Sequence, residues 1–544
     1  MSARVKIVSD RAKKVRWRVL HAAAFLTALI LAAGSGAGCP ASAGEAAASV
    51  QTRAEGLDTF PFPAEETAED PAVSPETGYA IAGGTGLFGE PGSDFGKGPA
   101  YSFPPAAGTA GNLSLLPDAF SWADLGKKPA VRSQGDLGTC WAITAASAVE
   151  AALLPGRRMV FSPDHISLQN GFNISQNEGG DYSMIMSYMA SRRGPVLESQ
   201  DPYGDGTSPS GLRPSACVRE MRLLRGLTRE EIKSMIYRFG PVQSSLCMDR
   251  ARTDLPQYSC YDKDTFGYYD PFPEDLNHDI LVLGWDDNFS REDFALDPQH
   301  GGAWICQNTW GEDFGDRGIF YVAYDDANLF RKGGIAYTDA AAADDCDNVL
   351  EQDSLGWQAR QGYGAESAYF AGVFESDRDQ ILEAAGLYAT GPSTACRLTL
   401  VRGFQDTGDL TRAVTGGGEE DLTQAVSGAG DGDLTRPAGG NGSGPSDTGT
   451  EGLCLAWLEN PGYYTLNMDR EIRLAAGEKF AVIVWIDTPG AEKPVAVETC
   501  KDKYTSGVTL KGRETYISPD GRAWDRTQTV YRTNACLKLY MRNE

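Results

Sequence analysis

An α+β domain followed by an all-β domain is the fold class that the sequence predicts. Helical patterns come first within residues 116–338 and strand-like runs come later, which is typical of an α+β fold. From residue 351 onward the pattern changes to short alternating or β-branched segments separated by turns, with Pro519-Asp520-Gly521 as a hairpin signal. The clearest helical segments are Trp141–Leu153 and Ser183–Arg192, and the clearest strand-like segments are Asp279–Trp285 and Ile319–Tyr324.

The whole chain divides into five parts, because 544 residues exceed what one hydrophobic core usually serves. Residues 44–115 are rich in Ala, Gly, Pro and Glu without periodicity, which is typical of an extended connector. Asp-Leu-Thr recurs at Asp409, Asp421 and Asp433 among residues with almost no apolar face, so we expect a flexible surface insert there. The predicted parts are a signal peptide (1–43), a pro-segment or stalk (44–115), the α+β domain (116–338), a linker (339–350) and the β domain (351–544) with a low-complexity insert (405–450).

The N-terminus has the layout of a secretory signal. A basic stretch from Arg4 to Arg18 precedes an apolar run from Val19 to Ala33. This run is shorter than the ~20 apolar residues that a stable transmembrane helix needs. Two routes of processing stay open, cleavage after Ala43 and lipid attachment at Cys39, and we favour cleavage. We therefore expect an exported protein, secreted or held at the cell surface, without a transmembrane span in the mature chain.

The charge balance excludes one class of partner. The chain has 74 acidic and 49 basic residues, a formal net charge of -25. Such a chain repels nucleic acids and anionic membrane surfaces. We therefore expect no nucleic-acid partner, and we also expect no cofactor and no metal ligand.

Cys140 is the candidate nucleophile. It stands between Gly138-Thr139 and Trp141, directly before an Ala-rich helical stretch, so we expect it at a helix N-terminus. There the unpaired backbone N–H groups and the helix dipole lower the pKa of a thiol from its ordinary ~8.5. The Cys140 N–H and the side-chain amide of Gln134 are both suited to donate to an oxyanion, as acyl transfer requires. A cysteine before a helix is by itself more often structural, so this interpretation depends on a base elsewhere.

His278 is the candidate base. It enters the apolar run Asp279–Trp285, where a neutral imidazole would be held rigidly and could pair with a thiolate. Of the other three histidines, His21 lies in the predicted signal, and we expect His165 and His300 to face solvent or to form local hydrogen bonds.

Asn308 is the candidate orienting residue. It ends a strand-like run just before Gly311. Its amide oxygen would accept a proton from the far ring nitrogen of His278 and so fix the orientation of the base. Trp310 is positioned to shield that bond from water.

These motifs together resemble the papain-type cysteine peptidases, in which Gln, Cys, His and Asn serve in that order. The span from Cys140 to His278 is 138 residues, within the ~130 to 150 expected for this arrangement. The resemblance covers roughly residues 116–326 and implies a papain-like domain with Cys140, His278, Asn308 and Gln134 as catalytic residues. It also implies that Gly179, Gly180 and Trp310 contact the substrate.

Two departures from that family concern disulfides and the pro-segment. Leu137 stands where the family usually has a cysteine, and Gln176 and Asn177 stand near its expected partner. The pairing of the eleven cysteines cannot be read from their spacing. The long helical inhibitory pro-segment of the family is not visible within residues 44–115, so whether that segment inhibits the enzyme stays open.

The C-terminal part resembles the lectin-like β-sandwich domain that accompanies such peptidases in bacterial surface proteins. The similar stretches include Ala368–Phe374, Gly386-Leu387-Tyr388 and the turn Gly477–Phe480. The resemblance implies a surface glycan or a protein as the ligand of this domain, but we predict no glycan-binding residues.

The leading functional hypothesis is therefore an exported cysteine endopeptidase acting on polypeptides. Two alternatives stay open. One is a surface adhesin with an inactive peptidase scaffold, and the other is a cysteine amidase that acts on cell-wall peptides.

Overall fold

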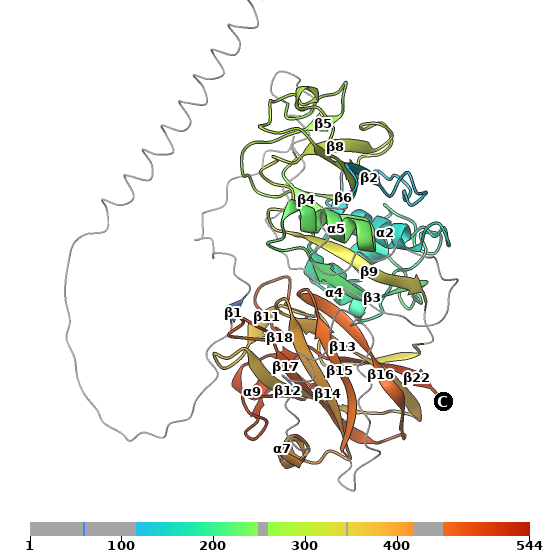
Figure 1. Cartoon of the computed structure of the whole chain (residues 1–544). Coiled ribbons are helices and arrows are strands. Elements are labelled where there is room, and N and C mark those ends of the chain that lie inside the picture. The colour runs from blue at the N-terminus through green and yellow to red at the C-terminus, as the bar shows by residue number, and fades with distance from the viewer. Residues whose placement is uncertain (1–57, 60–115, 249–258, 344–345, 417–449) are drawn as a thin grey trace, which may run out of the picture. The chain divides into compact units, whose positions relative to one another are not determined.

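The structure, a computed structural model, describes residues 58–59, 116–248, 259–343, 346–416 and 450–544 (Figure 1). The predicted signal peptide, and all of the predicted pro-segment except residues 58–59, lie outside the described residues. Within the described residues, no helix is long and apolar enough to cross a membrane.

The first domain has a buried central helix, α2 (Cys140–Leu153), which packs against α3 (Pro163–Leu168) and α4 (Tyr182–Ala190). Every residue of α2 from Cys140 to Ala151 is buried, which its five alanines in that stretch permit because small side chains let a helix pack closely on all sides. The other helices are α5 (Arg229–Phe239) and the short 3₁₀ helices η2 (Gln176–Glu178) and η3 (Arg291–Asp293).

A mostly antiparallel sheet forms the second half of this domain. Strand β6, which begins at His278, lies between β4 and β7, and β2 also pairs with its far end. Apolar side chains of β6 pack against α2 on one face and against the aromatic cluster of Trp122 and Trp304 on the other. The strands are β2 (Ala119–Ser121), β3 (Ala216–Leu223), β4 (Val242–Leu246), β5 (Gly267–Tyr268), β6 (His278–Asp286), β7 (Ala303–Gln307), β8 (Ile319–Ala323) and β9 (Gly334–Ala342).

The second domain is built almost entirely of strands, as predicted. One sheet has the order β15-β14-β17-β12-β19-β20, and its apolar side chains share a core with those of β13, β16 and β22. A smaller sheet has the order β1-β11-β18-β21. The strands are β1 (Asp58–Thr59), β10 (Asn348–Glu351), β11 (Ala359–Gln361), β12 (Ser367–Glu375), β13 (Gln380–Ala389), β14 (Thr394–Arg402), β15 (Thr450–Leu458), β16 (Gly462–Leu474), β17 (Lys479–Asp487), β18 (Val495–Glu498), β19 (Thr515–Ser518), β20 (Asp525–Arg526), β21 (Asn534–Ala535) and β22 (Lys538–Asn543).

Two predicted boundaries differ from the structure. The start of the predicted insert is not a loop, because residues 407–416 form helix α7 (Thr407–Gly416), which buries Leu410 and Ala413 against β14 and its neighbours. A second short helix, α9 (Thr527–Val530), follows β20. The predicted linker is partly strand, since β9 continues to Ala342 and β10 begins at Asn348. The start of the predicted insert packs against distant strands, and the predicted linker pairs with distant strands. These contacts order segments whose local sequence is weakly patterned.

The two domains share one sheet. Strand β3 of the first domain pairs antiparallel with β16 of the second, and the two strands lie within a 12-stranded sheet of the described residues. Arg222 of β3 forms an ion pair with Glu459 at 2.7 Å, and Tyr540 donates its hydroxyl to the Ala190 carbonyl at 2.7 Å. Side chains from both domains therefore pack into a single core.

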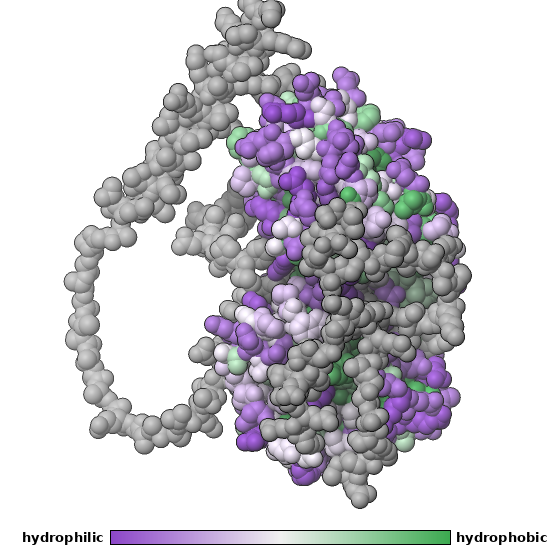
Figure 2. All heavy atoms as spheres, in the orientation of Figure 1, coloured by the Kyte–Doolittle hydropathy of each residue, from purple (hydrophilic) through white to green (hydrophobic). Residues whose placement is uncertain are grey.

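The visible described surface is predominantly hydrophilic (Figure 2). The large apolar side chains that are exposed lie far apart in the sequence and include Leu125, Phe272 and Val530. Scattered apolar residues of this kind are ordinary on a protein surface and do not by themselves indicate a site.

Candidate active site

Cys140 is the first residue of α2, as the sequence predicted, and its side chain is buried with 4% exposure. The backbone N–H groups of Asp279, Trp141 and Cys140 itself all favour the ionised form of the Cys140 thiol by hydrogen bonding. The Asp279 N–H reaches the Cys140 thiol, and Asp279 directly follows His278. The start of β6 therefore lies beside the start of α2.

The acidity of the thiol differs from the prediction. Burial raises the pKa of Cys140 to about 12, and the Asp279 carboxylate adds to this increase, whereas the three backbone N–H groups oppose it. The cost of removing an isolated thiolate from water therefore outweighs the helix-end effect that the sequence argument relied on. A thiolate in this site needs a counter-charge close by, and a protonated His278 can supply one.

His278 and Asn308 are joined by a hydrogen bond of 2.7 Å between Nε2 and Oδ1, with both side chains buried. Asn308 Oδ1 also accepts the backbone N–H of Thr309 at 2.7 Å, which identifies this atom as the oxygen of the amide. Nε2 of His278 must therefore carry the proton, and Nδ1 is left as the basic nitrogen. The Trp310 ring packs on the imidazole at a centroid distance of 4.9 Å.

Gln134 is tied to the same turn. Its backbone N–H donates to the Thr309 carbonyl at 2.8 Å, and its side-chain oxygen accepts the Thr309 hydroxyl at 2.6 Å. Its amide nitrogen donates to the Leu137 carbonyl at 2.7 Å, which uses one of its two hydrogens. The loop before Cys140 and the turn after β7 are thus held together by Thr309, a residue that the sequence analysis did not single out.

Gly179 and Gly180 lie against the start of α2. A Cβ atom on Gly180 would come within 2.1 Å of the Trp141 ring, so only glycine fits there. A Cβ on Gly138, two residues before the nucleophile, would come within 3.0 Å of the Gly179 nitrogen. The predicted substrate strip therefore borders the predicted nucleophile.

A loop of the second domain braces the approach to this strip. Lys503 forms an ion pair at 2.8 Å with Glu178, the residue before Gly179, and lowers the pKa of Glu178 to about 2. Asn173 donates its backbone N–H to the Tyr504 carbonyl at 2.9 Å and its side-chain amide to the Lys503 carbonyl at 3.2 Å. These contacts join residues more than 300 positions apart, which no local pattern predicts.

Asp279 is the other site residue that the sequence analysis missed. Its carboxylate accepts hydrogen bonds from Gln243 Nε2 at 2.6 Å and from Ser245 Oγ at 2.5 Å. Burial raises its pKa to about 6, although these two hydrogen bonds oppose the increase. An acidic residue at the head of an apolar strand was the available signal for it.

The remaining histidines have local partners. His165 is buried rather than solvent-facing, and its Nδ1 lies 2.7 Å from the Tyr188 hydroxyl. His300 is exposed and lies 3.0 Å from an Asp325 carboxylate oxygen.

The described cysteines are all free thiols, including Cys140. Where the related peptidases have a disulfide, the loops carrying Leu137 and Gln176 nevertheless lie together, since Gly138 approaches the Gln176 carbonyl. Across the described ranges, no group of three or more His, Cys, Asp or Glu side chains is arranged to hold a metal ion.

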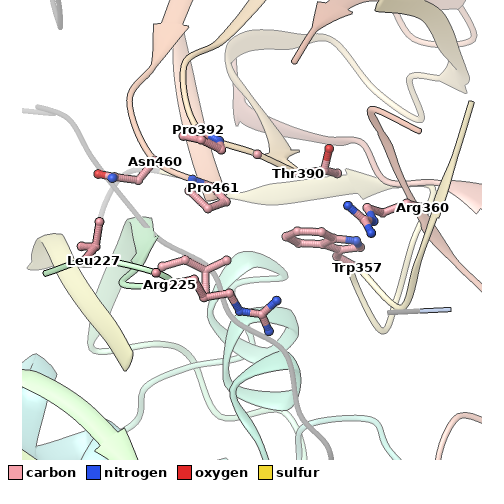
Figure 3. A pocket seen from close by; sticks show the side chains of 11 residues that line it. Arg225, Leu227, Trp357, Arg360, Thr390, Pro392, Asn460 and Pro461 are labelled. Atoms are coloured by element: carbon pink, nitrogen blue, oxygen red, sulfur yellow. The ribbon is translucent and has the colours of Figure 1, made fainter. Parts of the chain in front are cut away.

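A cavity of about 420 Å³ lies away from these residues (Figure 3). Leu227 and Arg225 line it from the loop after β3, and Trp357, Arg360 and Pro461 line it from the second domain. Burial and the nearby Arg360 lower the pKa of Arg225 to about 10. None of the predicted site residues lines this cavity.

Comparison with known proteins identifies both domains. Residues 116–341 match the model of the papain family of cysteine proteases, and residues 349–425 and 441–541 match that of the lectin like domain. The papain-like domain and the lectin-like domain are thus the two domains that the sequence analysis expected.

Curated relatives match the papain-like domain. Cathepsin S of Bos taurus is 30% identical over 223 residues, which is 39% of this chain and 62% of the relative. Cathepsin K of Gallus gallus is 27% identical over 233 residues, 41% of this chain and 63% of the relative. The chain thus spans about three fifths of the length of these relatives.

A solved structure resembles both domains together. It comprises the cysteine protease and lectin-like domains of Cwp84, a surface layer associated protein of Clostridium difficile, with a TM-score of 0.63 and 20% identity. The match covers 79% of this chain and 89% of that one. The arrangement of a papain-like fold followed by a lectin-like fold is therefore shared.

Proposed function

We propose that this protein is an exported cysteine endopeptidase that hydrolyses peptide bonds with Cys140 as nucleophile and His278 as base. The observation that carries the proposal is the hydrogen bond between His278 Nε2 and Asn308 Oδ1 at 2.7 Å, which directs Nδ1 to act as the base beside the start of α2. The match of residues 116–341 to the model of the papain family supports it.

The reaction begins with a proton transfer. Burial raises the pKa of the Cys140 thiol, so its ionisation depends on a base that accepts the proton. His278 Nδ1 accepts the thiol proton, so that thiolate and imidazolium arise together as a pair, and the thiolate sulfur then attacks the carbonyl carbon. Asn308 holds the imidazolium in place without adding a charge.

The tetrahedral oxyanion is held by two N–H donors. The Cys140 backbone N–H and the second hydrogen of the Gln134 amide supply them, while Thr309 keeps the Gln134 oxygen turned away. His278 then protonates the leaving amine, the C–N bond breaks, and an acyl-enzyme forms on sulfur. Water, deprotonated by His278, hydrolyses the thioester and restores the thiol.

The substrate is a polypeptide that lies along Gly179 and Gly180, where the absence of side chains lets another backbone approach closely. Trp310 borders the site through its contact with His278. A surface glycan or a protein is the proposed ligand of the lectin-like domain.

Export is supported by the basic and apolar leader in the sequence and by the surface-layer association of Cwp84. N-terminal sequencing of the mature protein tests it, because cleavage after Ala43 and a lipid at Cys39 give different first residues and masses. A mature chain that keeps its leader would contradict export.

The decisive test is hydrolysis of an unfolded protein by wild type and by two variants. We expect Cys140→Ala to abolish hydrolysis, and Gln134→Ala to lower the rate by ~10²- to 10³-fold, as for the loss of one oxyanion donor. A thiol-reactive epoxide should label Cys140 alone at neutral pH. Full activity in Cys140→Ala would sink the proposal.

The same experiment separates the alternatives. An adhesin with an inactive scaffold predicts no hydrolysis and no selective labelling of Cys140. A cysteine amidase predicts hydrolysis of purified cell-wall peptides but not of unfolded protein.

A further inference from the structure

Asp279 has a buried carboxyl group beside Cys140. The proposed reaction does not use this group. It follows His278 on β6 and is 8% exposed. Its backbone N–H acts on the Cys140 thiol, and its carboxylate charge acts against ionisation of that thiol. Asp279 therefore acts on Cys140 through both its backbone N–H and the charge of its carboxylate.

Gln243 connects this carboxylate to the first turn of α2. The Gln243 Nε2 group donates to Asp279 at 2.6 Å and to the Trp141 carbonyl at 3.1 Å, using both of its hydrogens. Its oxygen accepts the Tyr337 hydroxyl at 2.7 Å, so the amide is satisfied on every side and cannot rotate without losing bonds. The Thr144 hydroxyl of α2 also donates to the Asp279 carbonyl, at 3.2 Å.

Ser245 connects the carboxylate to the substrate strip. Its hydroxyl donates to Asp279 at 2.5 Å and lies 2.7 Å from the Tyr182 hydroxyl. Because the single Ser245 proton goes to Asp279, Tyr182 must be the donor to Ser245. Tyr182 begins α4, two residues after Gly180.

We propose that Asp279 is a positioning residue for the peptidase reaction, which fixes the first turn of α2, and with it Cys140, against the His278 end of β6 through Gln243. This inference rests on the proposed peptidase function. The same carboxylate places a negative charge beside the thiol, so its protonation changes the reactivity of Cys140.

The sign of that change follows from the surroundings. Burial raises the pKa of Asp279 to about 6, and the Asp181 carboxylate adds to the increase. Asp279 is thus ionised at pH 8, where it disfavours the thiolate, and protonated at pH 5, where it does not. The titratable groups that surround it are Cys140 on α2, His278 on β6, Asp181 and Tyr182 at the start of α4, and Tyr337 on β9.

The test compares wild type with Asp279→Asn in two assays. The first is the rate of Cys140 alkylation by iodoacetamide, followed by intact mass, at pH 8 and pH 5. We expect the variant to react about tenfold faster at pH 8, the effect of one pKa unit, and at the same rate at pH 5. The second is kcat/KM on an unfolded protein at pH 8, which we expect to fall about tenfold because the amide nitrogen that replaces one carboxylate oxygen cannot accept a hydrogen bond.

Gln243→Leu keeps the charge and removes the bridge to Trp141. We expect its kcat/KM to fall like that of Asp279→Asn while its alkylation follows wild type at both pH values. This variant also serves as the test should Asp279→Asn fail to fold. Asp286→Asn is the matched control at the other end of β6, where the side chain accepts the Asn288 N–H, and it should change neither assay.

A merely structural role would not make alkylation at pH 8 faster and kcat/KM lower in the same variant. Alkylation that slows at both pH values, or alkylation and kcat/KM that both stay at wild-type values, would overturn the proposal, as would an unchanged kcat/KM in Gln243→Leu. If wild type hydrolyses no peptide while the pH-dependent alkylation difference holds, the proposed function fails and the electrostatic role of Asp279 stands.

Discussion

Asp279 in the papain-like domain and Asp353 in the lectin-like domain are buried carboxyl groups with opposite surroundings. Burial raises the pKa of each to about 6. Asp353 is bonded at 2.5 Å to the ammonium group of Lys538, which is itself fully buried. The donors bonded to Asp279 are a neutral amide and a neutral hydroxyl.

The two carboxylates differ in whether a bonded cation cancels their charge. Burial lowers the pKa of Lys538, but Asp353 and Glu351 together raise it by more, so both members of the pair are charged at neutral pH. Their fields cancel at short range, which leaves a structural element. The charge of Asp279 is not cancelled by its donors, so it acts on the thiol of Cys140. Burial alone therefore does not identify a functional carboxylate, whereas burial with neutral donors beside a nucleophile does.

The largest effect is expected from breaking the cancelled pair. Lys538→Met leaves Asp353 buried without its cation, so we expect the free energy of unfolding to fall by ~3–5 kcal/mol. Urea unfolding measures this, and alkylation of Cys140 in the folded variant should stay at the wild-type rate. The exposed Lys511→Met is the control. A loss no larger than that of the control would mean that the pair is not structural.

The next largest effect is expected at His278, the proposed base, which lies beside Asp279. Asn308→Ala removes the acceptor that orients His278, so we expect kcat/KM to fall by ~10- to 100-fold, as for loss of a group that orients a functional histidine. Steady-state hydrolysis of an unfolded protein measures it. Asn288→Ala, in an exposed turn, is the matched control. Wild-type kcat/KM in Asn308→Ala would refute the assignment of Asn308.

A third effect tests the raised pKa of Asp279. Because the folded-state pKa of Asp279 is about 6 and its ordinary value is 3.8, its contribution to stability is lost as pH rises between these values. We expect Asp279→Asn, which lacks this loss, to gain on the order of 2 kcal/mol relative to wild type between pH 4 and pH 7. Urea unfolding at several pH values measures it. A difference that does not change with pH would contradict the assignment.

The smallest effect is expected at the exposed brace between the domains. Exposed ion pairs are weak because solvent screens them, so Lys503→Glu should raise KM by less than about fivefold and leave kcat unchanged. The charge-reversed double variant Glu178→Lys with Lys503→Glu should restore KM. A change in kcat instead of KM would show that the brace acts on the chemistry rather than on the substrate strip.

The sequence was sufficient for the parts of the site that lie in local motifs. Cys140 at a helix start, His278 at a strand start and the two-domain organisation follow from short-range patterns, and the structure agrees with them. The helix-end effect on the Cys140 pKa has the predicted sign, but the larger opposing effect of burial was not predicted, because desolvation depends on everything packed around the thiol. Gln243, Thr309 and Lys503 reach the site across long stretches of chain, and no periodicity encodes such contacts.

The pairing of β3 with β16 joins the two domains through the backbone hydrogen bonds of one sheet rather than through a linker alone. In a molecule that is attached to a surface through its lectin-like domain, this pairing would limit how far Cys140 and the substrate strip can lie from the point of attachment. Which peptide bonds it cuts would then depend on their distance from the point of attachment as well as on side-chain preference.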